Sequence, residues 1–473
     1  MNDVAAKTLS AQDLIGDLLE AQQSLTAVDQ FSQRHEAAGE PLQAKYYRDL
    51  IPLERPGAGE QYSFEVDLEA CSACKACVSA CHHLNGLEVY ESWRDIGSLL
   101  GDGGQKTVTT ACHHCAEPAC ADGCPVLAYE KDGDTGIVRH LDDQCIGCRY
   151  CEMKCPYGVP KYSVRLGIVR KCDMCYGRLV ADEAPACVQA CPNGAIAIKV
   201  VQAEEVPTDG QIVPGAFDSS YTRPTTSFVG WEPSENLRPA GETKQRPAHA
   251  HLPLVVMLVL TQASLGVSAA ALLLGSPALR WIAVVLGGIG LAASVFHLGQ
   301  PLKAWKAFLG WRRSWLSREI LAFGPWFAAL LMFAATGIPA AGWAVIGLGV
   351  GAVFCSVMVY VDTRREFWSL PRSAGRFYGT SLVCGGAVLG PWWLLAATVV
   401  KLVAELDSLR VTGSRRLMIR ELGGVTAARF ALMGAGLAGS MISPWLALGF
   451  ILAGELSERV LFFSAVIEPR MPS

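Results

Sequence analysis

The second half of the chain is a nearly continuous run of apolar residues, interrupted by short segments rich in arginine and lysine. An apolar stretch of about 17 residues or more is long enough for a helix to cross a bilayer. Six stretches have this character: 252–274, 279–299, 320–338, 343–361, 425–441 and 443–464. We therefore expect an all-α transmembrane domain over residues 251–466.

A seventh apolar stretch, 374–407, fits either one long helix or two short helices broken at Gly390-Pro391. The charges in the connections decide between them, because basic loops belong on the cytoplasmic side of a membrane. The basic loops are 300–318, 362–376 and 408–424. If 374–407 formed one helix, loops 362–376 and 408–424 would face opposite sides of the membrane. If it forms two helices, all three loops lie on the same side. We therefore expect eight transmembrane helices with both ends in the cytoplasm, although 374–390 is barely long enough to span.

Residues 61–200 show a different pattern, in which short β-rich runs alternate with groups of cysteines. The runs are 62–66, 107–110, 137–140, 168–170 and 195–200. Strand, cysteine turn, helix and strand follow one another twice, so we expect an α+β domain of two ferredoxin-like modules.

Two further segments flank this domain. Residues 1–60 are predicted to form a helical arm, in which a capping box at Ser10–Asp13 precedes the apolar positions Leu14–Leu19. The arm either packs on its own domain or docks a partner. Residues 201–250 are rich in proline, threonine, serine and glycine, which indicates a strap or linker toward the membrane.

The charge balance separates the same two halves. Residues 250–473 carry 18 Lys+Arg and 9 Asp+Glu, a net charge of +9, whereas residues 1–249 carry −13, which gives −4 overall. A chain of 473 residues also exceeds the usual length of one domain.

Sixteen of the 18 cysteines lie between Cys71 and Cys191, in four groups of four. The groups are Cys71, Cys74, Cys77, Cys81; Cys112, Cys115, Cys120, Cys124; Cys145, Cys148, Cys151, Cys155; and Cys172, Cys175, Cys187, Cys191. The first and third groups have the C-x2-C-x2-C-x3-C spacing that holds [4Fe–4S] clusters, and the third adds the trailing Pro156. We expect four [4Fe–4S] clusters, whose common use is to move single electrons over distance.

Other interpretations of the cysteines are weaker. A disulfide scaffold requires a short secreted chain, and the start of this sequence has no secretory pattern. Structural zinc suits isolated C-x2-C pairs better than crowded triplets. No C-x2-C is followed by histidine, which excludes covalent c-type haem. His113-His114, inside one cysteine pair, are better explained as supporting or surface polar residues than as ligands.

Ionisable residues within apolar stretches are expensive and suggest function. His297 and Glu319 lie at the ends of the second and third apolar stretches, on either side of one basic loop. They could exchange protons with a quinone; alternatively, His297 bonds a carbonyl and Glu319 pairs with Arg318. A single histidine beyond His251 also argues against a b-type haem, so we expect no haem.

A second set of charges lies deeper in the membrane domain. It comprises Lys401, Glu405, Glu455, Glu458 and Arg459. Lys401 and Glu405 are one helical turn apart and can face each other. The set forms either an ion-pair network that fixes helix packing, or a proton path or quinone-pocket wall.

The sequence resembles a known family at two motifs. Residues 145–158, 171–175 and 187–192 resemble the four-cluster subunit of dimethyl sulfoxide reductase-type molybdoenzymes. Residues His297–Pro301 and Ser314–Glu319 look like the signature of the quinone-binding membrane anchor of these enzymes. The two subunits are then fused in one chain.

The resemblance implies roles for particular residues. The first three cysteines of one group would join the last cysteine of another, so that groups one and four share two clusters and groups two and three share two more. His297, Glu319 and Arg318 would form a site for ubiquinone or menaquinone.

The resemblance also implies a place in a complex. A separate chain would carry the molybdopterin catalytic site, and we expect no nucleic-acid partner. The basic loops place the cluster domain on the cytoplasmic side of the inner membrane, and no twin-arginine pair for its export is found near the N-terminus. The alternative, export together with a signal-bearing partner, would invert the charge pattern. The cytoplasmic orientation favours a quinone-linked sulfite dehydrogenase over a reductase of dimethyl sulfoxide or a related S- or N-oxide. A hypothesis from a different functional class is a non-redox membrane scaffold, whose domains are stabilised by bound metal for assembly.

Overall fold

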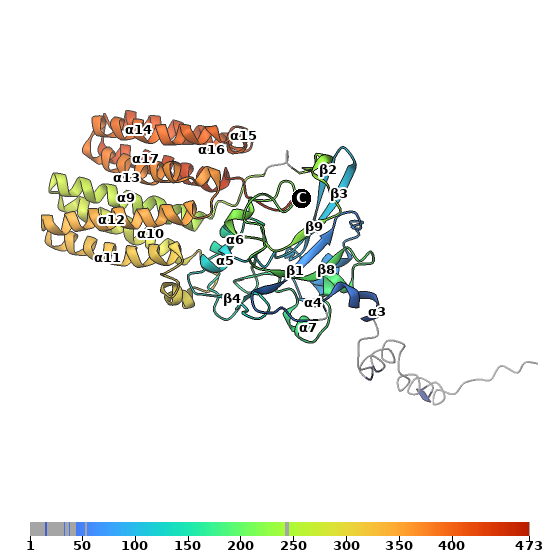
Figure 1. Ribbon diagram of the computed structural model, residues 1–473. Helices are drawn as coiled ribbons and strands as arrows, with labels where there is room; N and C mark the ends of the chain where they lie inside the picture. Colours follow the sequence, from blue (N-terminus) through green and yellow to red (C-terminus); the bar gives the residue numbers. More distant parts are fainter. Residues whose placement is uncertain are drawn as a thin grey trace, which may run out of the picture.

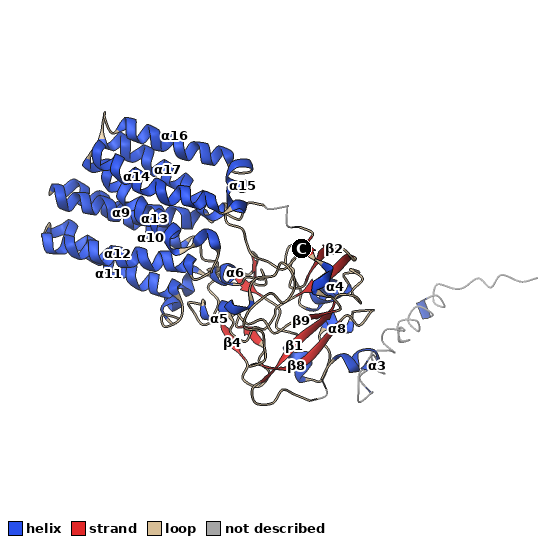
Figure 2. Cartoon of the chain, turned by 45° about the horizontal axis from the view of Figure 1, so that its top comes forward, coloured by secondary structure: helices blue, strands red, loops and turns tan. Residues whose placement is uncertain are grey.

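The computed structural model describes residues 15–16, 33, 37, 44–52, 54–241 and 246–472. The predicted arm helix at Leu14–Leu19 lies, apart from Ile15 and Gly16, outside these residues. The described chain forms a head, which holds all of its strands, and a bundle of long, roughly parallel helices (Figures 1 and 2).

The strands of the head form two three-stranded sheets, in the orders β8-β1-β9 and β10-β2-β3, and the two hairpins β4-β5 and β6-β7. The strands are β1(Glu60–Asp67), β2(Asp95–Gly101), β3(Gly104–Thr110), β4(Tyr129–Lys131), β5(Val138–His140), β6(Lys161–Ser163), β7(Ile168–Arg170), β8(Ile196–Gln202), β9(Ser227–Val229) and β10(Arg238–Pro239). The five predicted runs correspond to β1, β3, β5, β7 and β8. β9 and β10 come from the segment expected to be a strap, which therefore adds a strand to each larger sheet.

Six short α-helices lie in the described part of the head. They are α3(Ala44–Tyr47), α4(Ala76–Leu84), α5(Ala119–Asp122), α6(Tyr150–Lys154), α7(Tyr176–Val180) and α8(Ala186–Gln189). Four of them, α4, α5, α6 and α8, carry cysteines of the four groups. α4 packs against α8, and α5 packs against α6. The head thus has the strands and cysteine-bearing helices expected of a ferredoxin-like domain, and its division into two modules stays a prediction.

Eight helices of 17 to 23 residues occupy the described chain between residues 252 and 464. They are α9(Leu252–Leu274), α10(Pro277–Val295), α11(Trp315–Thr336), α12(Pro339–Val361), α13(Leu370–Leu389), α14(Pro391–Asp407), α16(Gly423–Gly439) and α17(Pro444–Ser464), with the short α15(Thr412–Arg420) meeting α16 at 84°. The chain breaks at Gly390, whose φ of 126° suits glycine, as the two-helix interpretation of 374–407 predicts.

Of these helices, α9 to α12 are long and apolar enough to cross a membrane by length and hydropathy. The break at Gly390 leaves α14 with only 17 residues, and α17 contains three charged side chains. The crossing of the bilayer by α13, α14, α16 and α17 stays a prediction.

The basic loops all lie at the end of the bundle that faces the head (Figure 1). Loop 300–318 contacts the head through Lys303, whose Nζ donates to the carbonyl of Asp143. In loop 362–376, Arg365 donates to the carbonyl of Met153. Arg372, in the first turn of α13, pairs with Asp407 at the end of α14, so the connection 408–424 begins at the same level.

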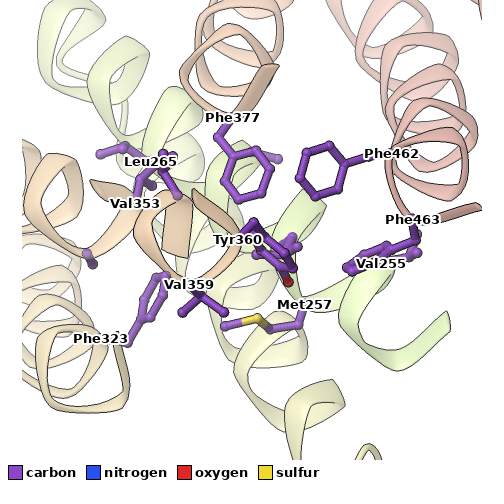
Figure 3. Packing of buried hydrophobic residues seen from close by; sticks show 14 of the residues in the cluster. Val255, Met257, Leu265, Phe323, Val353, Val359, Tyr360, Phe377, Phe462 and Phe463 are labelled. Carbon is purple, nitrogen blue, oxygen red and sulfur yellow. The ribbon is translucent and has the colours of Figure 1, made fainter. Parts of the chain in front are cut away.

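An aromatic cluster lies between the helices of the bundle (Figure 3). Tyr360 of α12 contacts the rings of Phe377, Phe462 and Phe463, with centroids 5.1 to 5.7 Å apart. One continuous core joins these side chains to the part of the head around α6. The head and the bundle are therefore packed as one body. The chain also returns to the head after α17, where Met471 is 4% exposed in a separate head core.

Candidate functional site

The structure gathers the sixteen cysteines of the head into four quartets, each made from two sequence groups. We name them by their order from the bundle outward. The membrane quartet is Cys124, Cys145, Cys148, Cys151; the second is Cys112, Cys115, Cys120, Cys155; the third is Cys81, Cys172, Cys175, Cys187; and the distal quartet is Cys71, Cys74, Cys77, Cys191. This is the interleaved pairing that the resemblance implies.

The thiols of each quartet influence one another electrostatically. Burial raises the pKa of the Cys151 thiol well above its usual value, and the neighbouring charges of Cys148 and Cys124 raise it further. Burial likewise raises the pKa of Cys81 to about 12, with a contribution from Cys187. Thiolates crowded in this way require a nearby positive charge, such as that of iron.

Backbone N–H groups point at several of the sulfurs. Ala128 and Ala195 donate to Cys124 Sγ and Cys191 Sγ over 3.2 and 3.3 Å. Gly147 donates to Cys145 Sγ over 3.4 Å, in a loop where the next cysteine is followed by left-handed Arg149, with φ 60°. Successive left- and right-handed residues form concave nests of N–H groups that stabilise anions. The loops thus suit a negatively charged group held by thiolates.

A buried polar side chain lies in each gap between neighbouring quartets. Tyr129 lies between Cys151 and Cys120, and burial raises its pKa well above the usual value. Lys171 Nζ lies 3.5 Å from Cys112 Sγ and donates to the carbonyl of Cys172. Arg94, 1% exposed, lies among thiols of the third and distal quartets. The two cations offset thiolate charge, and the quartets form one continuous row.

The cysteine spacing favours iron–sulfur clusters over structural zinc, because C-x2-C-x2-C triplets bring three thiolates around one group. Zinc requires its thiolates at about 2.3 Å from a single point. In a [4Fe–4S] cluster each thiolate binds a different iron, so the sulfurs lie further apart. The quartets therefore suit cubane clusters.

The first anchor motif, His297–Pro301, lies directly against the membrane quartet. His297 Nε2 donates to the carbonyl oxygen of Cys148 over 2.7 Å. Gln300 binds the same loop, because its N–H donates to the carbonyl of Ile146 over 3.0 Å. A Cβ on Gly299 would lie only 2.0 Å from the carbonyl oxygen of Gly167, so glycine is required for this close approach.

The second anchor motif, Ser314–Glu319, fixes the other loop of the same quartet. Ser314 Oγ donates to the carbonyl of Gly123 over 2.7 Å, and Ser317 Oγ donates to that of Pro125 over 3.3 Å. Gly123 and Pro125 are the residues on either side of Cys124. Both motifs therefore hold the membrane quartet against the helix ends, a role that their sequence pattern did not reveal.

Glu319 lies inside the bundle in the second turn of α11, 5% exposed. The hydroxyl of Ser356 donates a hydrogen bond to its carboxylate. Arg318 does not pair with Glu319 in the described structure. Its guanidinium donates instead to the carbonyls of Trp311 and Arg312, over 3.0 and 2.7 Å. Arg318 thus stabilises the loop between the two motifs.

His297 lies in the turn after α10 and is partly buried. Burial lowers its pKa, against an opposing contribution from its hydrogen bond to Cys148. Glu319 lies near the part of the head that His297 contacts. Burial raises the pKa of the hydroxyl of Tyr150, the residue before Cys151, and the charge of Glu319 contributes. The same hydroxyl donates to the carbonyl of Val359 in the bundle.

His113 and His114 are buried core residues, 2% and 0% exposed, rather than surface polar groups. The His113 ring packs edge-on against Tyr157, with centroids 4.4 Å apart. His114 Nδ1 accepts a hydrogen bond from the N–H of Val138. Burial lowers the pKa of His113 to about 3, so it is neutral and serves packing.

A buried ionic network joins α13, α14, α16 and α17. Its members are Arg376, Lys401, Glu405, Arg429, Glu455, Glu458 and Arg459. Each is at most 6% exposed. Arg429 bridges Glu405 and Glu455 at 2.7 and 3.0 Å, and Lys401 contacts both carboxylates.

Two members of this network were not foreseen. Arg376 was expected in a basic loop, which is wrong, because α13 begins at Leu370 and carries Arg376 into the bundle, 1% exposed. Arg429 follows a basic loop in an otherwise apolar stretch, and only the packing of α16 against α17 brings it to Glu455.

We expect Arg429→Met to destabilise the bundle by about 3–5 kcal/mol, because it leaves two buried carboxylates, Glu405 and Glu455, with Lys401 as their one shared cation among the described residues. Arg410→Met is the matched control, since the Arg410 side chain is 82% exposed and its pair with Asp407 contributes about 0–1 kcal/mol. Thermal unfolding of the purified membrane protein measures the difference. Equal unfolding temperatures for the two variants would show that the network does not hold the helices together.

The row of thiolate quartets and the attached helical bundle define an iron–sulfur electron-transfer protein with its own membrane anchor. A family model described as a 4Fe-4S dicluster domain matches residues 105–201, and one described as the DMSO reductase anchor subunit matches residues 247–420.

Known relatives align with the head. The probable anaerobic dimethyl sulfoxide reductase subunit YnfG of Escherichia coli K12 is 34% identical over 197 residues, which is 39% of this protein and 94% of the relative. The B subunit of anaerobic dimethyl sulfoxide reductase from the same strain is 34% identical over 196 residues, with the same coverage. The hydrogenase-2 operon protein HybA of Escherichia coli O157:H7 is 33% identical over 160 residues, 28% of this protein and 49% of HybA.

The chain belongs to the family of electron-transfer subunits of dimethyl sulfoxide reductase-type enzymes, with the iron–sulfur and membrane-anchor subunits fused. It is therefore an electron-transfer component of an oxidoreductase complex in a membrane.

Proposed function

We propose that this chain transfers electrons between a membrane quinone and a separate molybdopterin-containing catalytic subunit. The observation that carries the proposal is the hydrogen bond from His297 to the carbonyl of Cys148. A quinone bound beside His297 would lie next to the membrane quartet. Electrons would then need no path across the bilayer.

Each quartet would hold one [4Fe–4S] cluster through four thiolates. Bound clusters would supply one-electron transfer along the row. The protein contributes the ligands, the N–H groups that point at the sulfurs, and the cations Lys171 and Arg94, which make reduction more favourable than in an uncharged site.

The quinone site would consist of His297 and Glu319, with Arg318 fixing the loop between them. His297 Nε2 donates to a carbonyl, so Nδ1 of the neutral ring is an acceptor, which would bind the hydroxyl of a quinol. Glu319 keeps further acceptor capacity beyond its bond from Ser356. Ubiquinone and menaquinone both suit this chemistry. No haem is proposed, because two histidine ligands are not found within the helical stretches.

The head is proposed to face the cytoplasm from the inner membrane. All three basic loops lie at the head end of the bundle, and basic loops favour the cytoplasmic side. Exposed tryptophans within the first five residues of α12, α14 and α17 support eight crossings, because tryptophan is enriched at membrane–water interfaces. They are Trp343, Trp392, Trp393 and Trp445.

Epitope insertion tests this orientation. A tag after Arg312 is expected to be accessible only from the cytoplasmic side, and tags after Gly275 and Ile442 only from the outside. Protease treatment of intact cells and of inverted vesicles measures the accessibility. Cleavage of the Arg312 tag in intact cells would reverse the orientation, and opposite results for Gly275 and Ile442 would contradict the eight-helix count.

The distal quartet is the proposed contact with the catalytic subunit. Cys74 is the one exposed cysteine of the sixteen, all of which are described, and it lies at the end of the row farthest from the bundle. The names of the relatives favour a reductase of dimethyl sulfoxide or a related S- or N-oxide. Sulfite dehydrogenase is the second candidate, favoured only by the proposed cytoplasmic orientation.

Purification through a tag on this protein is expected to recover a large subunit that contains molybdenum. Assays of the complex then separate the candidates, since the first reduces dimethyl sulfoxide with quinol and the second reduces quinone with sulfite. A stable preparation with full iron but without molybdenum would contradict the proposed partner.

A further inference from the structure

Three histidines form a row where the head meets the bundle. The rings of His249 and His251 are 4.8 Å apart between centroids, and those of His251 and His297 are 5.6 Å apart, both edge to face. His249 Nδ1 accepts a hydrogen bond from the N–H of His251, which fixes the pair. His249 and His251 come from the segment before α9, so the row joins parts of the chain that are distant in sequence.

This row leads from His297 into a polar cavity of about 690 Å³ between the head, the segment before α9 and the chain after α17. The cavity walls include His249, His251, Arg149, Glu152, Arg365 and Glu468. Among the described residues, none hydrogen-bonds to the ring nitrogens of His251. Because the His251 side chain lines the cavity, its ring nitrogens can bind water there.

The groups around His251 keep its ring uncharged near neutral pH. Burial lowers the pKa of His251 to about 3, and the cations Arg149 and Arg365, together with His297 and His249, contribute. The carboxylates Glu152 and Glu468 line the same cavity. α17 contributes the apolar Phe463, 6.0 Å from the His251 ring between centroids. A neutral imidazole can accept a proton on one nitrogen and release one from the other.

We propose that His251, together with His249, transfers protons between the cavity water and a quinone bound beside His297. This inference rests on the proposed quinone site. Oxidation of one quinol would release two electrons, which a cluster held by the membrane quartet would accept one at a time, and two protons, which would pass through His251 and His249 to the cavity. Reduction of a quinone runs the same transfers in the opposite direction. His297 positions the quinone, and His251 connects it to water.

The test uses the intact membrane-bound complex and a short-chain quinol. His251→Ala is expected to lower quinol-linked turnover about tenfold or more, the effect of losing a proton-transfer group. The clusters should remain assembled and reducible by dithionite. Added imidazole should restore turnover, because it can enter the cavity and replace the missing ring. His249→Ala should cause a smaller loss.

Phe463→Leu is the matched control, since it alters the packing around His251 without removing an imidazole. It should keep nearly full turnover and show no response to imidazole. The inference is overturned if His251→Ala keeps at least half of the turnover, or if its loss is not reversed by imidazole. If His251→Ala does not assemble, His251→Asn is judged by the same criteria, and failure of both variants to assemble shows a structural role.

The proposed quinone site is tested separately with His297→Gln. Full quinol-linked turnover in both His297→Gln and Glu319→Gln would overturn that site, whatever the result for His251→Ala. An inactive His297→Gln beside a fully active His251→Ala would overturn only the proton transfer through His251.

Discussion

Replacing His297 with glutamine is expected to lower quinone-linked electron transfer about 100-fold, the scale of losing a positioning group at a reaction site. The glutamine side chain can still donate to the carbonyl of Cys148, so the membrane quartet should stay docked. The measurement compares quinol-linked reduction of the clusters with their reduction by dithionite. Only the first should fall.

Gln300→Ala is the matched control for docking. It removes one neighbouring hydrogen bond to the head, from Gln300 Nε2 to the carbonyl of Leu166 at 2.8 Å, worth about 1 kcal/mol. Its turnover should change only a few-fold. Glu319→Gln should behave like His297→Gln and keep its clusters. If both His297→Gln and Glu319→Gln retained full quinone-linked turnover, the quinone site would lie elsewhere.

Iron content is the second expected result. Protein purified without oxygen should contain about sixteen iron and sixteen sulfide per chain, since four quartets would hold four cubane clusters. Cys148→Ser should remove about four iron atoms and end electron exchange with quinone. Burial raises the pKa of several of these thiols, among them Cys81 and Cys151, so assembly of the head should depend on iron.

The two cysteines of the bundle provide the control. Cys355 and Cys384 lie in α12 and α13, away from the quartets, so Cys355→Ser and Cys384→Ser should keep all the iron. Elemental analysis with electron paramagnetic resonance of the reduced protein measures each variant. Zinc in place of iron would support the non-redox scaffold, and about eight iron atoms would mean that two quartets stay empty.

The sequence predicted the features that depend on residues close together in the chain. Cysteine spacing of two and three residues identifies cluster ligands, because those residues must turn around one group. Apolar runs identify the bundle helices. The basic loops indicate the break at Gly390, since basic residues favour the cytoplasmic side and only two helices place all of these loops on that side. The motifs His297–Pro301 and Ser314–Glu319 were visible as well, but their hydrogen bonds to the loops of the membrane quartet were not.

The tertiary structure decided which distant residues meet. Cys71 and Cys191 join one quartet although 120 positions separate them, and no local spacing encodes that partnership without the resemblance. Arg376 and Arg429 enter the ionic network because helix packing, not hydropathy, sets which face of α13 and α16 is buried. His251 reaches His297 because the segment before α9 passes beside the turn after α10. Such contacts arise from the packing of whole elements, which pattern and composition along the chain do not specify.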